Sequence, residues 1–253
     1  MENKGLTEPT PAAASRATGT LYMLPVAISD APVDAALPQL NLDVMRRLRH
    51  FIVEDLRSAR RFLRRCDRTF PIDDCTFAEL NEHTRRADVN SMLEPLRRGE
   101  DVGVMSEAGC PGVADPGADV VAEAQREGLR VVPLVGPSSI LMALMASGFN
   151  GQRFTFHGYL PATESARAHA LRELEADSRR SATTHIFIET PYRNNQMLRS
   201  CMLSLASGTM LCIASAITDP AHESIRTLPV RQWKHSGCEL AKVPTIFLIH
   251  VVK

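Results

Sequence analysis

The amino-acid sequence predicts an α/β protein in which a parallel N-terminal sheet is followed by a mixed C-terminal sheet. In the first half, short β-branched apolar runs alternate with segments of helical pattern, which is the rhythm of a parallel sheet. In the second half, fewer helical segments separate the apolar runs, which favours a mixed or antiparallel sheet. With 253 residues, of which 44% are hydrophobic and 23% charged, the chain can bury a sizeable core.

The expected elements follow from these runs in order. The strands expected in the first half are 21–24, 51–53, 102–105 and 129–135, with helical segments at 44–48, 56–65, 89–98 and 120–126. The strands expected in the second half are 154–156, 185–188, 210–214, 224–227 and 244–252. Residues 1–18 lack an apolar run and are expected to form a flexible tail. The predicted domains are then 19–135 and 136–253.

Two loops rich in glycine and proline follow consecutive expected strands. Residues 106–117 read Ser-Glu-Ala-Gly-Cys-Pro-Gly-Val-Ala-Asp-Pro-Gly, and residues 135–139 read Val-Gly-Pro-Ser-Ser. Glycine allows positive φ and close approach to a ligand, while proline stiffens a turn. Ser138 also stands where it can cap an apolar helix that runs to Ser147. Because consecutive parallel strands end at one sheet edge, these loops indicate a ligand site there.

The loop pattern excludes the common phosphate-binding motifs. A Walker loop needs G-x-x-x-x-G-K-[ST], and a dinucleotide fingerprint needs G-x-G-x-x-G after the first strand, whereas residues 24–29 contain no glycine. A nucleoside that carries a sulfonium fits better than NAD or ATP. The six cysteines form no C-x-x-C pair, so neither a metal site nor a disulfide framework is expected. The only lysines are Lys4, Lys234, Lys242 and Lys253, which excludes a mid-chain lysine from any mechanism.

Acidic residues follow two of the expected strands. Glu54 and Asp55, with Arg57 close behind, stand where a strand gives way to a helix. Such acids either cap the helix N-terminus or act at a reaction site. Glu189 ends a later strand and precedes a turn at 190–193, which is either a salt-bridged turn or part of an active sheet edge.

The segment from 46 to 68 is dense in arginine, although the formal net charge of the chain is zero. Its arginines are Arg46, Arg47, Arg49, Arg57, Arg60, Arg61, Arg64, Arg65 and Arg68. They either form solvated helix faces or follow a phosphate backbone. Phe51, Phe62 and Phe70 are the only aromatic residues in the segment's vicinity, so the sequence does not indicate stacking of single-stranded bases.

Taken together, these motifs resemble the tetrapyrrole methylase superfamily (class III S-adenosylmethionine-dependent methyltransferases), and within it the branch that contains ribosomal RNA small-subunit methyltransferase I. Residues 106–117 are similar to the family's S-D-A-G-T-P-G-I-S-D-P-G. Residues 133–138, which begin in the next expected strand, are similar to its P-G-P-S-A. Three further segments resemble the family's E-D-T-R, F-x-G-F-L-P and E-S-P-H-R: residues 54–57, 156–161 and 189–193. The resemblance covers residues 19–250.

No run of eighteen apolar residues occurs, so we expect a cytoplasmic protein without a membrane anchor. The resemblance implies a two-domain methyltransferase with the tetrapyrrole-methylase-like fold, which works as a homodimer. It implies that S-adenosylmethionine binds in the cleft between the domains and that the acceptor is RNA of the small ribosomal subunit, methylated at a ribose 2′-oxygen. We expect Glu54, Arg57 and Glu189 to lie near the acceptor as the catalytic residues. The implied cofactor-binding residues are Gly109, Cys110, Val113, Ser139 and Ile140, with Glu107, Ser138 and Pro191 as neighbours.

Two segments depart from the family pattern. The family's P-T-P-I-G-N is Pro-Val-Ala-Ile-Ser-Asp at residues 25–30, and its A-R-E-[IL]-T-K is Ala-Ser-Ala-Ile-Thr-Asp at residues 214–219. Three functions therefore stay open: an RNA methyltransferase, a methyltransferase acting on a tetrapyrrole or another small molecule, and a cofactor-binding protein without catalysis. For a hydroxyl acceptor, the candidate bases are Glu54, Asp55, Glu107, Glu189 and His83.

Overall fold

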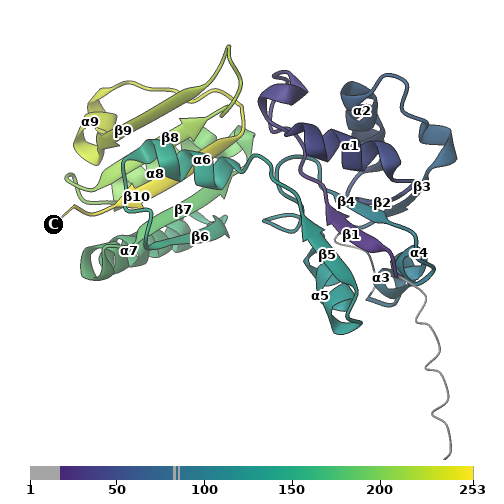
Figure 1. Ribbon diagram of the computed structural model, residues 1–253. Helices are drawn as coiled ribbons and strands as arrows, with labels where there is room; N and C mark the ends of the chain where they lie inside the picture. Colours follow the sequence, from purple (N-terminus) through teal and green to yellow (C-terminus); the bar gives the residue numbers. More distant parts are fainter. Residues whose placement is uncertain (1–17, 82–83, 85, 253) are drawn as a thin grey trace, which may run out of the picture.

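The computed structural model describes residues 18–81, 84 and 86–252, which form two five-stranded sheets lying side by side (Figure 1). Nearly all of the segment expected as a flexible tail, and His83, lie outside these residues. The N-terminal sheet has the order β3-β2-β4-β1-β5, and its strands are parallel, as the sequence predicts. Its strands are β1 (Thr20–Met23), β2 (His50–Val53), β3 (Thr76–Glu79), β4 (Val102–Met105) and β5 (Arg130–Pro133).

Helices cover both faces of this sheet, because successive residues of a strand point to opposite sides. Phe51 and Val53 of β2 belong to the core formed with α1 (Gln39–Arg47) and α2 (Leu56–Cys66). Ile52 belongs to the core on the opposite face, with helices α3 (Arg86–Met92), α4 (Glu94–Arg97) and α5 (Ala118–Arg126). The short 3₁₀ turns η1 (Val33–Ala35) and η2 (Ile72–Asp74) complete the N-terminal half.

The C-terminal sheet has the order β6-β7-β10-β8-β9 and is mixed, which confirms the predicted fold class. Only β6 and β7 pair in parallel, and α7 (Glu164–Ser181) connects them, while the other neighbours are antiparallel. Its strands are β6 (Phe154–Tyr159), β7 (Thr184–Glu189), β8 (Met210–Ser215), β9 (Ser224–Pro229) and β10 (Thr245–His250).

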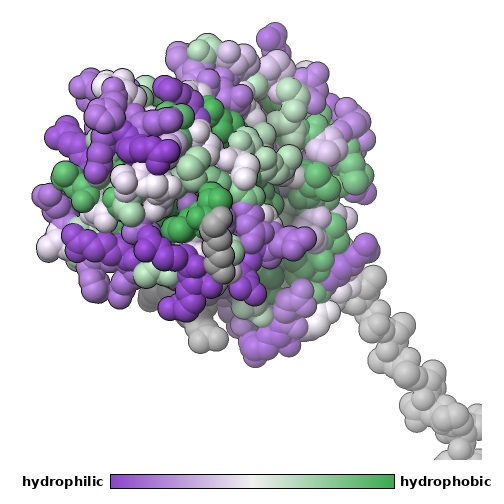
Figure 2. Space-filling view, turned by 90° about the vertical axis from the view of Figure 1, so that its left-hand side faces the viewer, coloured by the Kyte–Doolittle hydropathy of each residue, from purple (hydrophilic) through white to green (hydrophobic). Residues whose placement is uncertain are grey.

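This second sheet is also covered on both faces. The stacked rings of Phe187 and Phe247 lie in the core formed with α7, α8 (Asn194–Ser204) and α9 (Val230–His235). Ile186 and Leu248 belong to the opposite core with α6 (Ser139–Ser147), the helix that follows β5. Figure 2 shows hydrophilic and hydrophobic residues mixed over the side of the molecule that carries these C-terminal elements. None of the helices in the described part of the chain is long and apolar enough to span a membrane.

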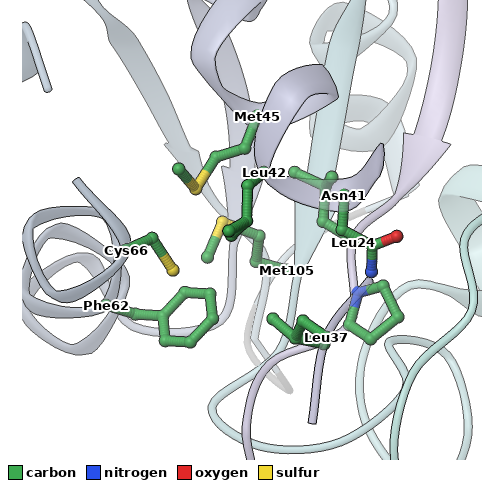
Figure 3. Close-up of a pocket in the computed structure, with 9 residues that line it drawn as sticks. Leu24, Leu37, Asn41, Leu42, Met45, Phe62, Cys66 and Met105 are labelled. Atoms are coloured by element: carbon green, nitrogen blue, oxygen red, sulfur yellow. The ribbon is translucent and has the colours of Figure 1, made fainter. Parts of the chain in front are cut away.

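A small apolar cavity lies between α1, α2, the segment that follows β1 and the end of β4 (Figure 3). Its volume is about 10 Å³, and its walls include Leu24, Met45, Phe62, Cys66 and Met105. That volume is close to what one water molecule requires, and the walls offer water few polar partners. The cavity is therefore a packing gap in the N-terminal core. Burial raises the pKa of the Cys66 thiol in its wall to about 11, which leaves this thiol poorly reactive near neutral pH.

Candidate functional site

The site begins where the chain leaves β1 and β4 in opposite directions across the N-terminal sheet. From β1 the chain passes over β4 to β2, whereas from β4 it passes over β1 to β5. Loops that diverge in this way open a crevice at the carboxyl ends of the strands. The two diverging loops are residues 25–30 and 106–117, and both line a large cleft.

Backbone hydrogen bonds hold these two loops together. The Val26 amide donates to the Gly109 carbonyl over 2.8 Å, and the Gly109 amide donates back over 3.0 Å. Gly109 has φ +76°, a conformation that other residues rarely adopt. The loop after β5 packs on the same structure, because a Cβ on Gly136 would lie 2.1 Å from the Cβ of Pro25. Glycine at these two positions allows three loops to meet.

The cleft has a volume of about 930 Å³ and is walled by both sheets. A small-molecule site of several hundred cubic ångströms holds a nucleoside-sized ligand. The N-terminal half contributes the loops above and one face of α2. The C-terminal half contributes the end of β7, the end of β8 and the start of β10, since β10 runs antiparallel to both neighbours and reaches this edge with its first residues.

Three carboxylates gather at the N-terminal wall of the cleft. The amide of Glu107 donates to Glu54 Oε2 over 3.1 Å, and the Ser58 hydroxyl donates to Glu107 Oε1 over 3.1 Å. Asp115 joins them: burial, and then the nearby charge of Glu54, raise the pKa of its carboxyl to about 6. Such a group changes charge close to physiological pH, which is typical of functional sites. Asp115 lies in the loop 106–117, which the sequence indicates as part of a ligand site.

Asp55, next to Glu54, is the N-cap of α2. Its carboxylate accepts a hydrogen bond of 2.7 Å from the Ser58 amide, and this bond is the first cause that lowers the pKa of Asp55. The two adjacent acids therefore have different roles. Asp55 caps the helix, which is one of the two alternatives that the sequence left open, while Glu54 lines the cleft.

Replacing the cap tests this separation. We expect Asp55→Ala to lower the free energy of unfolding, because one amide at the start of α2 loses its acceptor. Asp55→Asn retains an acceptor and should retain most of the stability. Chemical denaturation of both variants measures the difference, and equal stability of Asp55→Ala and wild type would contradict the capping role.

The second loop begins α6 as the sequence predicts. Ser138 is the N-cap, and its hydroxyl accepts from the Leu141 amide over 3.5 Å. Ser138, Ser139 and Ile140 all line the cleft. Cys110, from the first loop, donates through its thiol to the Pro137 carbonyl over 3.4 Å, and burial raises the pKa of this thiol. The thiol therefore links the two loops as a neutral group.

Glu189 lies at the end of β7 and is engaged by its own turn. Its carboxylate accepts from the Thr190 amide over 2.7 Å and lies 2.8 Å from Arg193 Nη2, while its side chain is only 2% exposed. This is the salt-bridged turn that the sequence offered as one alternative. The arrangement fixes the start of η3 (Pro191–Arg193), whose Pro191 lines the cleft.

The two segments that depart from the family pattern meet across the cleft. The Ser29 hydroxyl donates to the Thr218 carbonyl over 3.0 Å, and the hydroxyls of Ser29 and Thr218 are also 3.0 Å apart. Thr218 has φ +70° and Ala216 φ +49°, so this loop after β8 holds two non-glycine residues in the left-handed region. The departures thus supply a direct contact between the two halves of the molecule.

Most of the residues selected from the sequence line this one cleft. They are Glu54, Glu107, Gly109, Cys110, Val113, Ser138, Ser139, Ile140, Glu189 and Pro191. Arg57 is not among the lining residues. Sequence reasoning missed Ser58 of α2 and the stretch 243–246, whereas Arg61 and Arg65 belong to the arginine-dense segment that it singled out. The sequence alone could not place residues 243–246 at the cleft, because their position depends on the antiparallel pairing of β10 with its neighbours.

Comparison with known proteins identifies relatives along most of the chain. The chain is 30% identical over 233 residues to ribosomal RNA small subunit methyltransferase I of Vibrio cholerae, a match that covers 91% of this chain and 76% of that protein. It is 31% identical over 214 residues to the protein of the same name in Pseudomonas aeruginosa, covering 85% of this chain and 71% of the relative.

Solved structures share the fold at lower identity. The methyltransferase CobJ matches with a TM-score of 0.59 at 16% identity, covering 92% of this chain and 94% of that one. The cobalt precorrin-4 methyltransferase CbiF matches with a TM-score of 0.55 at 14% identity, covering 91% of this chain and 94% of its own. The family model of the tetrapyrrole (corrin/porphyrin) methylases matches residues 39–231. The chain therefore belongs to the tetrapyrrole methylase family and is a methyltransferase.

Proposed function

We propose that this protein transfers a methyl group from S-adenosylmethionine to RNA of the small ribosomal subunit, at a ribose 2′-oxygen. The observation that carries the proposal is the match, over most of both chains, to relatives named as ribosomal RNA small subunit methyltransferase I. Solved structures of the same fold include uroporphyrin III C-methyltransferase and cobalt precorrin-4 methyltransferase, but their sequence identity to this chain is only 13–14%.

The cleft suits the proposed methyl donor. Its volume of about 930 Å³ exceeds that of a nucleoside, and apolar residues from both halves line it, among them Val113, Ile140 and Ile246. The carboxylates of Glu54, Glu107 and Asp115 on one wall favour a cationic ligand. S-adenosylmethionine supplies an electrophilic methyl group on a positively charged sulfur. Gly109, Cys110, Val113, Ser138, Ser139 and Ile140 would hold it, with Glu107 and Pro191 beside them.

In this proposal the chain contributes positioning and one proton acceptor. Walls that exclude water and hold two reactants in line lower the barrier of a displacement. Glu54 is the proposed base: it takes the proton of the acceptor hydroxyl as the bond from oxygen to the methyl carbon forms and the bond from sulfur breaks. Glu189, whose carboxylate is bound to its own turn, is proposed to position Pro191 instead.

We further propose a homodimer. Support comes from exposed apolar residues beside and on α6: Val135, Leu141 and Met145 are 74%, 50% and 84% exposed. Leu141 and Met145 are one helical turn apart and so share a face. A second copy of the chain would cover such a face. Action on ribosomal RNA would place the protein in the cytoplasm.

Transfer of labelled methyl groups tests the proposed function. Wild-type protein, tritiated S-adenosylmethionine and ribosomal subunits from a strain that lacks this protein are incubated, and incorporation is measured in small and in large subunits. We expect label in the small subunits only, and a rate at least about 10²-fold lower for Glu54→Gln, because this variant lacks the base. Binding of the donor without label in any RNA, or label transferred to a tetrapyrrole instead, would contradict the proposal.

A further inference from the structure

Most arginines of α2 already contact a group within the protein. Three of them make such contacts. Arg60 lies 3.7 Å from the Asp73 carboxylate, Arg64 donates to the Arg68 carbonyl over 2.7 Å, and Arg65 donates to the Ser29 carbonyl over 3.1 Å. Arg60 also lies over the Phe77 ring, at 5.8 Å from its centroid. The guanidinium groups of these three residues stabilise the N-terminal half, so the arginine density of the sequence overstates the charge available to a partner.

Arg57 and Arg61 differ from the others. Both are exposed, and neither guanidinium has a hydrogen bond or an ion pair among the described residues. They are one turn apart and lie on the same side of α2. The acid closest in sequence, Asp55, is bound to the start of the helix. After the hydrogen bonds from Ser58, the charges of both arginines contribute to lowering the pKa of the Asp55 carboxyl. Arg61 lines the cleft, whereas Arg57 lies beyond it, so the two guanidinium groups form a path that leads along α2 into the cleft.

The opposite lip of the cleft carries an exposed aromatic ring. Tyr159, at the end of the edge strand β6, is 61% exposed and lines the cleft. The pairing of β6 with β7 shifts between Phe156 and Tyr159, where Gly158 has φ +64°. The Tyr159 hydroxyl has no hydrogen-bond partner among the described residues. A large ring left open to solvent at a site is suited to stacking on a flat ligand.

We propose that a single RNA strand crosses the mouth of the cleft between these two lips, with Arg57 and Arg61 binding its phosphates and Tyr159 stacking on a base. The proposal rests on the proposed function and names its recognition surface. Guanidinium groups bind phosphate oxygens in pairs, and exposed aromatic rings stack on unpaired bases. A partner that contacts both Arg61 in the cleft and Arg57 outside it has to extend beyond the cleft, as a polymer does and an enclosed tetrapyrrole does not.

Binding of a labelled single-stranded RNA tests the surface. Fluorescence anisotropy is measured at several salt concentrations, with S-adenosylhomocysteine present. We expect Arg57→Gln and Arg61→Gln each to lower the slope of log affinity against log salt by about 0.7. Arg60→Gln, on the same helix but engaged with Asp73, is the matched control and should leave the slope unchanged. We expect Tyr159→Ala to weaken binding about tenfold and Tyr159→Phe to bind as wild type.

Three outcomes overturn the proposal: no RNA binding by the wild type, equal slopes for Arg61→Gln and Arg60→Gln, or equal binding by Tyr159→Ala and Tyr159→Phe. Affinity for S-adenosylhomocysteine, measured by calorimetry, shows whether each variant is folded and has an intact cleft. Methyl transfer by the wild type separates the two proposals. If label enters small subunits while the variants match their controls, the recognition surface is wrong and the proposed function stands.

Discussion

Gly136→Ala is expected to weaken binding of S-adenosylhomocysteine at least about tenfold and to lower the free energy of unfolding by about 1–3 kcal/mol. The added Cβ would lie 2.1 Å from the Cβ and 2.5 Å from the Cγ of Pro25. A proline ring cannot turn away, and Pro25 is held only two residues after the end of β1. The loop at 135–139 must therefore move, and with it the carbonyl of Pro137 that accepts from Cys110.

Gly151→Ala is the matched control for this change. A Cβ on Gly151 meets nothing within 4 Å, and its φ is not in the left-handed region. This variant should differ from wild type by no more than about 0.5 kcal/mol in stability. Calorimetry and chemical denaturation measure both variants. If Gly136→Ala binds the ligand as tightly as Gly151→Ala, the loop after β5 does not form part of the binding site.

Asp115→Asn is expected to stabilise the protein increasingly as the pH rises from about 4 to about 6. The pKa of the Asp115 carboxyl is raised from 3.8 to about 6, mainly by burial. The folded state therefore binds the proton more tightly than the unfolded state, and wild-type stability falls through this window. The amide of asparagine stays neutral. The stability difference between the variant and wild type should grow by about 1–3 kcal/mol across the window and then stay constant.

Denaturation of wild type and Asp115→Asn at several pH values measures this difference. Asp34→Asn removes a charge from an exposed aspartate in η1 and controls for the change in net charge. A pH-independent difference for Asp115→Asn would show that its carboxyl is no more costly to ionise in the folded protein than in the unfolded chain. Neither burial nor the charges of Glu54 and Glu107 would then raise the pKa of the Asp115 carboxyl.

The sequence predicts the buried strands of the sheets better than the exposed edge strand β3. Because an apolar run before a glycine-rich loop is a local signal of a buried strand, the predicted strand 102–105 matches β4 (Val102–Met105), which is buried throughout. β3 was missed because Thr76–Glu79 is a short edge strand with no buried residue. The predicted segment 89–98 proved to be two short helices, α3 and α4, with Leu93 between them.

The candidate site shows the same division. The loop residues at 107–113 and 138–140 were found because their glycines, prolines and serine cap are local signals. The stretch 243–246 and Tyr159 enter the cleft only through the pairing of β10 and β6, which no local pattern reveals. The aromatic residues of the arginine segment are core residues, with Phe51, Phe62 and Phe70 at most 8% exposed. The exposed ring comes from the other half of the chain.

Calorimetric titration of S-adenosylhomocysteine into wild type, Val113→Trp and Leu203→Trp tests the central claim that the cleft between the sheets binds the methyl donor. Val113 is 50% exposed and lines the cleft, so a tryptophan there fills the cleft. Leu203 is 76% exposed on α8, away from the cleft lining. We predict stoichiometric binding by wild type and Leu203→Trp and loss of binding by Val113→Trp. No binding by wild type, or equal binding by all three proteins, would contradict the claim.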